Sequence, residues 1–143
     1  NSIQFPRPII NEGYNFSFSG LKTSVINYVR QHPETRTEDI AASFQEAAVE
    51  VLATKTRRAA IQIGAKGVCI GGVVAANSRL REAIFDICLE EGLHPFVPSR
   101  AYCTDNAAMV AAIGWRRFRQ DGPDPLDLGA DPNLQLPCRS LIS

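Results

Sequence analysis

The candidate functional residues lie at or just before the starts of predicted helices. Asn77 follows the glycine pair Gly71-Gly72 and a short apolar run, and a helical pattern starts directly after it. Glycines at such a junction let the backbone approach a ligand that a side chain would block, and the helix start offers unpaired N–H groups. Glycines at strand ends are also common in plain turns, so the pattern leaves a ligand site and a turn both open.

One carboxylate, Asp105, stands before the last predicted helix. As an N-cap it needs no function, but a carboxylate at a helix start can equally ligate a divalent metal. A single carboxylate rarely holds a transition metal, which usually takes about three or four ligands. The two histidines, His32 and His94, form no HExxH motif and have no neighbouring serine or cysteine motif, so no hydrolase site is predicted.

A further polar group precedes the first predicted helix. Ser17, Ser19 and Lys22 belong to a segment that alternates aromatic and small hydroxyl residues before Gly20. These side chains could meet an anionic ligand. The alternation by itself favours an edge strand followed by a turn.

Composition and charge limit the class of partner. The chain has 143 residues, 45% of them hydrophobic, with 15 basic and 15 acidic side chains, which fits one globular domain. Balanced charge argues against coating of nucleic acid or membrane by bulk charge, so a nucleic-acid site must be a local patch. The basic group Lys55, Arg57 and Arg58 favours a solvated helix face, with contact to an RNA backbone as the alternative.

The cysteines and the apolar runs indicate the compartment. The four cysteines show no close pairing, and Cys69 and Cys88 fall on apolar segments where cysteine serves as a small hydrophobe. No apolar run is long enough to cross a bilayer, and the first residues lack the features of a signal peptide. We therefore expect a reducing, cytoplasmic setting and no membrane partner.

The first half of the chain predicts a linker and two helices. Residues 1–15 contain prolines and no sustained period, which is typical of a linker. A helix over 21–31 ends at His32-Pro33, because proline cannot continue the hydrogen-bond ladder, and a second helix runs from an N-cap at Thr37 to about Ile63. Helical spacing predicts the buried faces, which consist of Leu21, Val25, Tyr28 and Val29 in the first helix and of Ile40, Phe44, Ala47, Ala48, Val51 and Leu52 in the second.

The second half predicts a β–α–β unit over residues 67–98. Strands at 68–70 and 93–98 flank a helix over 78–91 that stops at Gly92. We expect parallel strands, a right-handed crossover and sheet neighbours outside this chain. The expected buried face of this helix is Leu80, Ile84, Ile87 and Cys88. A last, largely apolar helix then runs from the segment at Asp105 to about residue 120, and prolines make 121–143 irregular.

Three motifs together resemble one family. They are Phe16-Ser-Phe-Ser-Gly-Leu-Lys-Thr23, the stretch from Gly71 to Arg81, and Cys103-Thr-Asp-Asn-Ala-Ala-Met109. With Phe5-Pro-Arg-Pro8 and Asp39-Ile-Ala-Ala-Ser-Phe-Gln45, they are similar in kind and order to the C-terminal half of the tRNA threonylcarbamoyladenosine synthase subunit, the family once called glycoprotease.

The resemblance implies a fold and an activity. The fold is α/β and helix-rich, part of the actin-like ATPase fold of sugar kinases and heat-shock ATPases, with residues 1–120 as the C-terminal lobe and 121–143 as a tail. Members transfer a threonylcarbamoyl group from threonylcarbamoyl-adenylate to the exocyclic amine of the adenosine next to the tRNA anticodon. The expected ligands are ATP or this adenylate and one divalent metal, iron or zinc. The expected partners are tRNA and the subunits of a threonylcarbamoyl-transfer complex.

The resemblance also implies which residues lie in the cleft. Asp105 would ligate the metal. The nucleotide would be contacted by Asn77 and by the backbone of Gly71 and Gly72, with Ser17, Ser19 and Lys22 in or near the cleft.

The chain departs from the family's pattern in two ways. Val73 stands where the family's motif has its second glycine, and a β-branched residue disfavours positive φ. The family's N-terminal half, with its His-x-x-x-His pair and glycine loop, is missing from this sequence, so we expect half an enzyme that transfers nothing alone. The alternative is a non-catalytic nucleotide-binding or subunit-interaction lobe, which would pair with the missing half, with partner subunits or with itself through exposed apolar faces.

Overall fold

A computed structural model describes residues 3–134 of the chain. The chain divides into two compact units, Asn1–Asp105 and Asn106–Ser143. The boundary expected near residue 120, between lobe and tail, stays a prediction.

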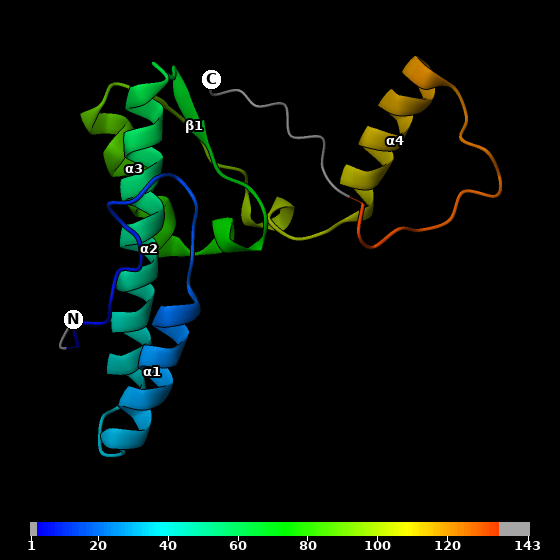
Figure 1. The fold of residues 1–143 in the computed structure, drawn as a ribbon. Coiled ribbons are helices and arrows are strands. Elements are labelled where there is room, and N and C mark those ends of the chain that lie inside the picture. The colour runs from blue at the N-terminus through cyan, green and yellow to red at the C-terminus, as the bar shows by residue number, and fades with distance from the viewer. Residues whose placement is uncertain (1–2, 135–143) are drawn as a thin grey trace. The chain divides into compact units, whose positions relative to one another are not determined.

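The order of elements follows the predicted one closely (Figure 1). They are α1 (Ser19–Gln31), α2 (Thr37–Gln62), β1 (Gly67–Cys69), the 3-10 turn η1 (Val73–Ala76), α3 (Ser78–Glu90), β2 (His94–Phe96), the 3-10 turn η2 (Arg100–Tyr102) and α4 (Ala107–Asp121). α2 is the longest, with 26 residues, and α1 and α3 lie alongside different parts of it in Figure 1. None of the helices that the structure describes is both long and apolar enough to span a membrane.

The ends of α1 and α2 can be compared with the boundaries and caps that the sequence predicts. α1 ends at the predicted break, with His32 as its C-cap. The N-cap of α2 is Arg36, without a side-chain hydrogen bond, and Thr37 is already helical, so the predicted Thr37 cap is wrong by one residue. Glu38 and Asp39 lie in the first turn of α2, where negative charge complements the helix dipole.

The predicted β–α–β unit is confirmed as a parallel pair of strands around α3. Val68 of β1 pairs with Pro95 of β2, and the N–H of Ile70 donates to the carbonyl oxygen of Phe96 at 3.1 Å. The strands are short, and each spans three residues. α3 ends where Gly92 adopts a φ of 65°, as its predicted role as helix stop requires. The handedness of the crossover stays a prediction.

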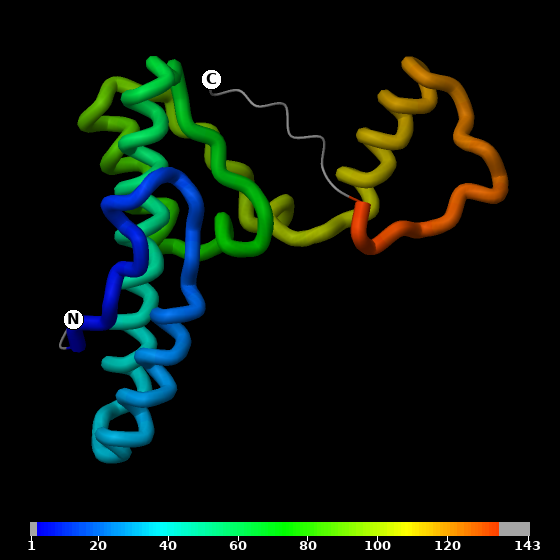
Figure 2. Tube along the Cα trace, in the orientation of Figure 1, coloured from blue at the N-terminus to red at the C-terminus, as the bar shows by residue number. Residues whose placement is uncertain are grey.

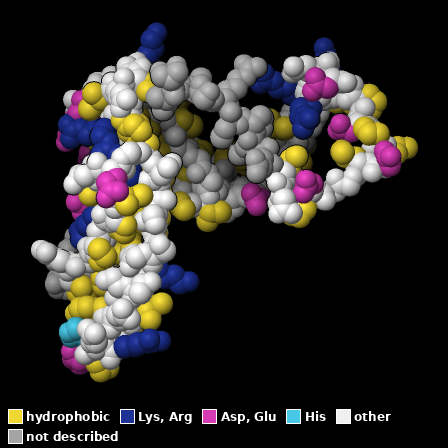
Figure 3. All heavy atoms as spheres, viewed as in Figure 1, with side chains coloured by type: hydrophobic (Ala, Val, Ile, Leu, Met, Phe, Trp, Pro, Cys, Tyr) yellow, Lys and Arg dark blue, Asp and Glu magenta, His cyan; other side chains and the backbone are white. Residues whose placement is uncertain are grey.

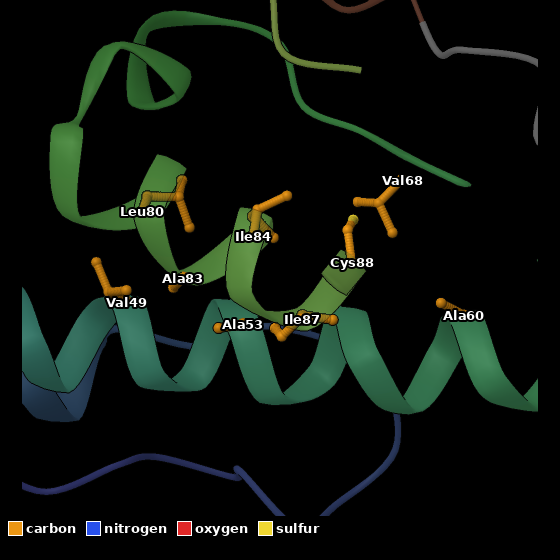
Figure 4. Close-up of a cluster of buried hydrophobic side chains, with 9 residues drawn as sticks. All are labelled: Val49, Ala53, Ala60, Val68, Leu80, Ala83, Ile84, Ile87 and Cys88. Atoms are coloured by element: carbon orange, nitrogen blue, oxygen red, sulfur yellow. The ribbon is translucent and has the colours of Figure 1, made fainter. Parts of the chain in front are cut away.

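One hydrophobic core joins α2, α3 and β1 (Figure 4). The predicted face of α3 is confirmed, because Leu80, Ile84, Ile87 and Cys88 are all buried. They pack against the side of α2 that carries Val49, Ala53 and Ala60. Each fully buried aliphatic side chain contributes on the order of 1.5–3 kcal/mol to stability, so this core fixes α3, and the residue that precedes it, against α2.

A second core corrects the linker prediction for residues 1–15. Ile3 and Phe5 are buried with Leu21 and Ala47, and the ring of Phe5 meets the ring of Tyr28 edge to face at 5.6 Å between centroids. Figure 2 shows this opening segment running beside α2 before the chain turns back into α1. Prolines remove any regular period here, and the buried side chains of Ile3 and Phe5 attach the start of the segment to the helix pair.

Two residues of the predicted helix faces are exposed. Val29 of α1 and Phe44 of α2 keep 45% and 41% of their surface accessible, whereas the predicted neighbours Leu21, Ala47 and Val51 are buried. Figure 3 accordingly shows hydrophobic side chains on the surface of the α1–α2 pair, among charged ones.

The second unit consists of α4 and the segment after it. The N-cap of α4 is Asn106, whose side chain accepts a hydrogen bond from the N–H of Met109 at 3.1 Å. Asp105 therefore does not cap this helix, which corrects one of its two predicted roles. No residue of α4 is buried among the residues the structure describes, and the guanidinium of Arg119 lies 5.8 Å from the ring centre of Trp115.

Candidate functional site

The stretch from Gly71 to Asn77 connects β1 to α3 through the turn η1. Gly72 adopts a φ of 78°, which glycine accepts at little cost. Val73 begins η1, is 67% exposed and has no positive φ. The expected backbone strain at Val73 is therefore absent, because Gly72 takes the left-handed conformation in this loop.

Asn77 holds the start of α3 against α2. Its Oδ1 accepts a hydrogen bond from the N–H of Leu80 at 3.0 Å, so Asn77 is the N-cap of α3. Its Nδ2 donates to Oε1 of Gln45 at 2.8 Å, across 32 positions of sequence. One side chain thus fixes the helix start and its position relative to α2.

A cavity of about 790 Å³ adjoins this stretch. Its wall includes Gly71, Asn77 and Gln45, and most of the remaining wall is apolar, with Phe18 from the loop before α1 and Phe44 from α2. A concave, mostly apolar space with a few polar groups is the usual form of a small-molecule site. The sequence did not indicate Phe18, Phe44 or Gln45 as site residues, because their spacing alone does not place them beside residue 71.

The polar group before α1 lies next to this cavity. Ser17 and Ser19 are within hydrogen-bond distance of each other, 3.4 Å between their Oγ atoms, and Ser19 starts α1. The edge strand that the alternation favoured is wrong, since the segment is a loop that enters a helix. Lys22 lines a second cavity, of about 490 Å³, and Phe18 and Phe44 contribute to the walls of both.

Asp105 is exposed and lies two positions before Ala107, the first residue of α4. Arg81 of α3 connects the segment before Asp105 to the start of α3. Its guanidinium donates to the carbonyl oxygen of Pro98 in that segment at 2.7 Å, and to the carbonyl oxygen of Ala75 in η1 at 2.9 Å. The guanidinium of Arg81 also approaches Sγ of the buried Cys103 at 3.9 Å. Arg81 thus anchors the segment that leads to Asp105.

The residues present do not form a metal site by themselves. Within residues 3–134 no three histidine, cysteine, aspartate or glutamate side chains converge as ligands. Asp105 would be one ligand of a site that needs about three or four.

The basic group Lys55, Arg57 and Arg58 does not form the solvated helix face that the sequence favours. Lys55 is 1% exposed, which excludes it from a solvated face. Arg57 forms ion pairs with Glu90 at 3.2 Å and with Glu91. Arg58 donates to backbone carbonyl oxygens of the opening segment. All three cations are committed within the fold, so neither the solvated face nor the contact to RNA holds for them as a group.

Two electrostatic features flank the α2–α3 contact. The guanidinium of Arg79 makes two hydrogen bonds of 2.9 Å to the carboxylate of Glu46, and these raise the pKa of Arg79 above its ordinary value. Burial raises the pKa of the Cys88 thiol, against a smaller opposing effect of a backbone hydrogen bond at Val68. Cys88 therefore acts as the small buried hydrophobe that was predicted, whereas Cys69 is exposed, contrary to expectation.

Comparison with known proteins tests the resemblance. The sequence profile of the family described as tRNA N6-adenosine threonylcarbamoyltransferase matches residues 1–112. Proteins of this description from Thermotoga neapolitana and Carboxydothermus hydrogenoformans are 47% identical over 133 residues and 48% identical over 125 residues, which is 92% and 87% of this chain. One from Geotalea daltonii is 50% identical over 118 residues, 79% of this chain.

The chain spans 35% to 41% of the length of these curated relatives. The profile covers all the proposed cleft residues, from Ser17 to Asp105. The resemblance read from the motifs is therefore confirmed, and the chain belongs to the tRNA N6-adenosine threonylcarbamoyltransferase family.

Proposed function

We propose that this chain forms the C-terminal lobe of an enzyme that transfers a threonylcarbamoyl group from threonylcarbamoyl-adenylate to an adenosine of tRNA. The observation that carries the proposal is the cavity beside Gly71 and Asn77, in a chain whose family is named for this reaction. By the earlier resemblance, the lobe belongs to the actin-like ATPase fold and works with tRNA and partner subunits in the cytoplasm.

The residues of the cavity wall have distinct roles in this proposal. Gly71 has open space around its Cα, so a ligand can approach the backbone there. Gly72 gives the loop its turn. Asn77 uses one N–H of its carboxamide for Gln45, and the second N–H is the group that we assign to the nucleotide.

The apolar part of the wall suits the adenine of ATP or of the adenylate. Phe18 and Phe44 offer ring surface to a flat base, and burial of a base against them adds favourable apolar contact. Ser17, Ser19 and Lys22 adjoin this wall, and we assign them to the polar or anionic part of the ligand. These residues would bind and orient the adenylate, so that the amine of the adenosine attacks a carbonyl held in place.

We assign Asp105 the role of a metal ligand, as the resemblance to the family implies. The described residues supply this carboxylate and no complete ligand set. We propose that the other ligands come from the part of the enzyme that precedes the lobe. For the same reason we expect the 143-residue chain alone to transfer nothing.

A hybrid protein tests the proposal. The segment of the Thermotoga neapolitana relative that precedes its matched region is fused to Asn1, and the hybrid is assayed with tRNA and threonylcarbamoyl-adenylate. We expect modified adenosine from the hybrid and none from the 143-residue chain. Transfer by the short chain alone, or a folded hybrid that binds neither ATP nor the adenylate, would count against the assignment.

A further inference from the structure

Lys55 is a buried cation without a carboxylate partner among residues 3–134. It lies in the C-terminal half of α2 and is 1% exposed. Its Nζ donates to the carbonyl oxygen of Glu12 at 2.8 Å and to that of Asn15 at 2.6 Å. It also lies 5.8 Å from the centre of the Phe16 ring. A buried ammonium group is costly unless its donors are paired, so these contacts are necessary for this packing.

Arg58 holds the same loop from the next turn of α2. Its Nη1 donates to the carbonyl oxygen of Ile10 at 3.2 Å, and its Nη2 donates to that of Gly13. Its guanidinium lies 5.2 Å from the centre of the Tyr14 ring, and the hydroxyl of Tyr14 donates to Gln62, further along α2. The loop between Ile10 and Phe16 is therefore attached to one side of α2 at several points.

The loop has little structure of its own to hold it. It contains no helix or strand, and Gly13 has a φ of 42°. Four of its backbone carbonyl oxygens are instead satisfied by the side chains of Lys55 and Arg58. The chain leaves this loop at Phe16 and enters directly the segment of Ser17, Phe18 and Ser19 beside the cavities.

We propose that Lys55 is a positioning residue whose buried ammonium group fixes the conformation of the loop of residues 10–16. Through this loop, Lys55 fixes the position of segment 17–22, to which the proposed function assigns ligand contacts. This inference rests on the proposed function for its link to the ligand, whereas the fixing of the loop is independent of that function. Neither Lys55 nor Arg58 lines either of the two cavities, so both act through this loop.

NMR relaxation of the 143-residue chain tests the fixing of the loop. In Lys55→Met, the order parameters of amides 10–18 are expected to fall from about 0.85 to below about 0.6, while those of α3 stay rigid. Lys55→Arg keeps the charge and the donors, so it should restore most of the order. The matched control is Lys66→Met, which removes an exposed lysine and should leave the loop rigid.

Arg58→Met provides a second test that does not depend on the folding of Lys55→Met. Arg58 is less buried than Lys55, so its loss should loosen residues 10–14 in a folded chain. A loop in Lys55→Met as ordered as in the control would overturn the proposal. A uniform loss of order over the whole chain in Arg58→Met would also overturn it.

Kinetics of the hybrid protein test the link to the ligand. Lys55→Met is expected to raise KM for the adenylate about tenfold with little change in kcat, because it disturbs a binding segment rather than the reacting groups. An unchanged KM in a variant with a loosened loop would overturn this link. A wild-type hybrid without activity counts against the proposed function alone, since the relaxation measurements still decide whether Lys55 fixes the loop.

Discussion

The carboxamide of Asn77 connects two helices, because its Nδ2 donates to Gln45 of α2 at 2.8 Å while its Oδ1 caps α3 through Leu80. The same residue is the one that the family resemblance assigns to the nucleotide. The observed structural role and the proposed binding role therefore fall on one side chain, and substitutions can separate them.

Asn77→Asp and Asn77→Ala separate the two roles. Asp keeps a good cap but loses the N–H donors, whereas Ala loses both, so we expect Ala to lower the free energy of unfolding by about 1–2 kcal/mol and Asp to lower it by less. Both variants should weaken ATP binding in the hybrid. Urea denaturation and calorimetric titration measure the two effects.

Asn27→Ala is the matched control, since Asn27 is exposed within α1 and alanine has the higher helix propensity. Equal stability of the Asp and Ala variants at position 77 would contradict the capping role. ATP affinity equal to that of the control would contradict the binding role.

Gly67 and Gly71 are predicted to respond in opposite ways to alanine. A Cβ at Gly67 would lie 2.5 Å from the carbonyl oxygen of His94, so Gly67→Ala should push the strands apart and destabilise the fold by about 1–3 kcal/mol. A Cβ at Gly71 meets no atom within 4 Å, so Gly71→Ala should change stability by less than about 0.5 kcal/mol.

The pair also tests the ligand site. If the backbone of Gly71 approaches the nucleotide, Gly71→Ala weakens nucleotide binding in the hybrid while thermal unfolding stays normal. Normal binding in this stable variant would show that the open space at Gly71 is not used by the ligand.

The buried thiol of Cys88 is expected to lower the free energy of unfolding at alkaline pH. A free cysteine thiol has a pKa of about 8.5. Burial raises the pKa of Cys88 above its ordinary value, so the folded chain keeps this proton to higher pH than the unfolded chain does. Above about pH 8.5 the unfolded state binds fewer protons, and the free energy of unfolding falls as pH rises, by at most about 1.4 kcal/mol per unit from this group.

Urea denaturation between about pH 7 and about pH 10 measures this slope. Cys88→Ala should be less stable at neutral pH but should lose less stability on going to high pH. Cys69→Ala, at an exposed thiol, is the control and should keep the slope. Parallel pH profiles for the wild type and Cys88→Ala would contradict the burial effect.

Helical periodicity correctly predicts the features of the fold that depend on residues close together in the sequence. The buried face of α3 and the break after α1 follow from residues within a few positions, and the structure agrees with both. The caps at Thr37 and Asp105 were each predicted one residue away from the true N-caps, Arg36 and Asn106. Neighbouring polar residues compete for such a position, and the local sequence does not decide between them.

Long-range contacts account for the larger errors. Lys55 belongs to a basic run, yet its partners are backbone carbonyl oxygens 40 and 43 positions away, which no side-chain pattern reveals. Ile3 and Phe5 likewise pack as single residues in a segment without a period. At the site, the motifs indicated Gly71 and Asn77, but the apolar wall of the cavity depends on how the α1 loop and α2 come together.

The most direct test of the central claim is mass-spectrometric detection of threonylcarbamoyladenosine in tRNA incubated with the hybrid protein and threonylcarbamoyl-adenylate. We predict that the hybrid forms the modified nucleoside, that hybrid Asp105→Ala does not, and that this exposed substitution leaves the thermal stability of the chain unchanged. A folded hybrid that forms no threonylcarbamoyladenosine, or an Asp105→Ala variant as active as the wild type, would contradict the account.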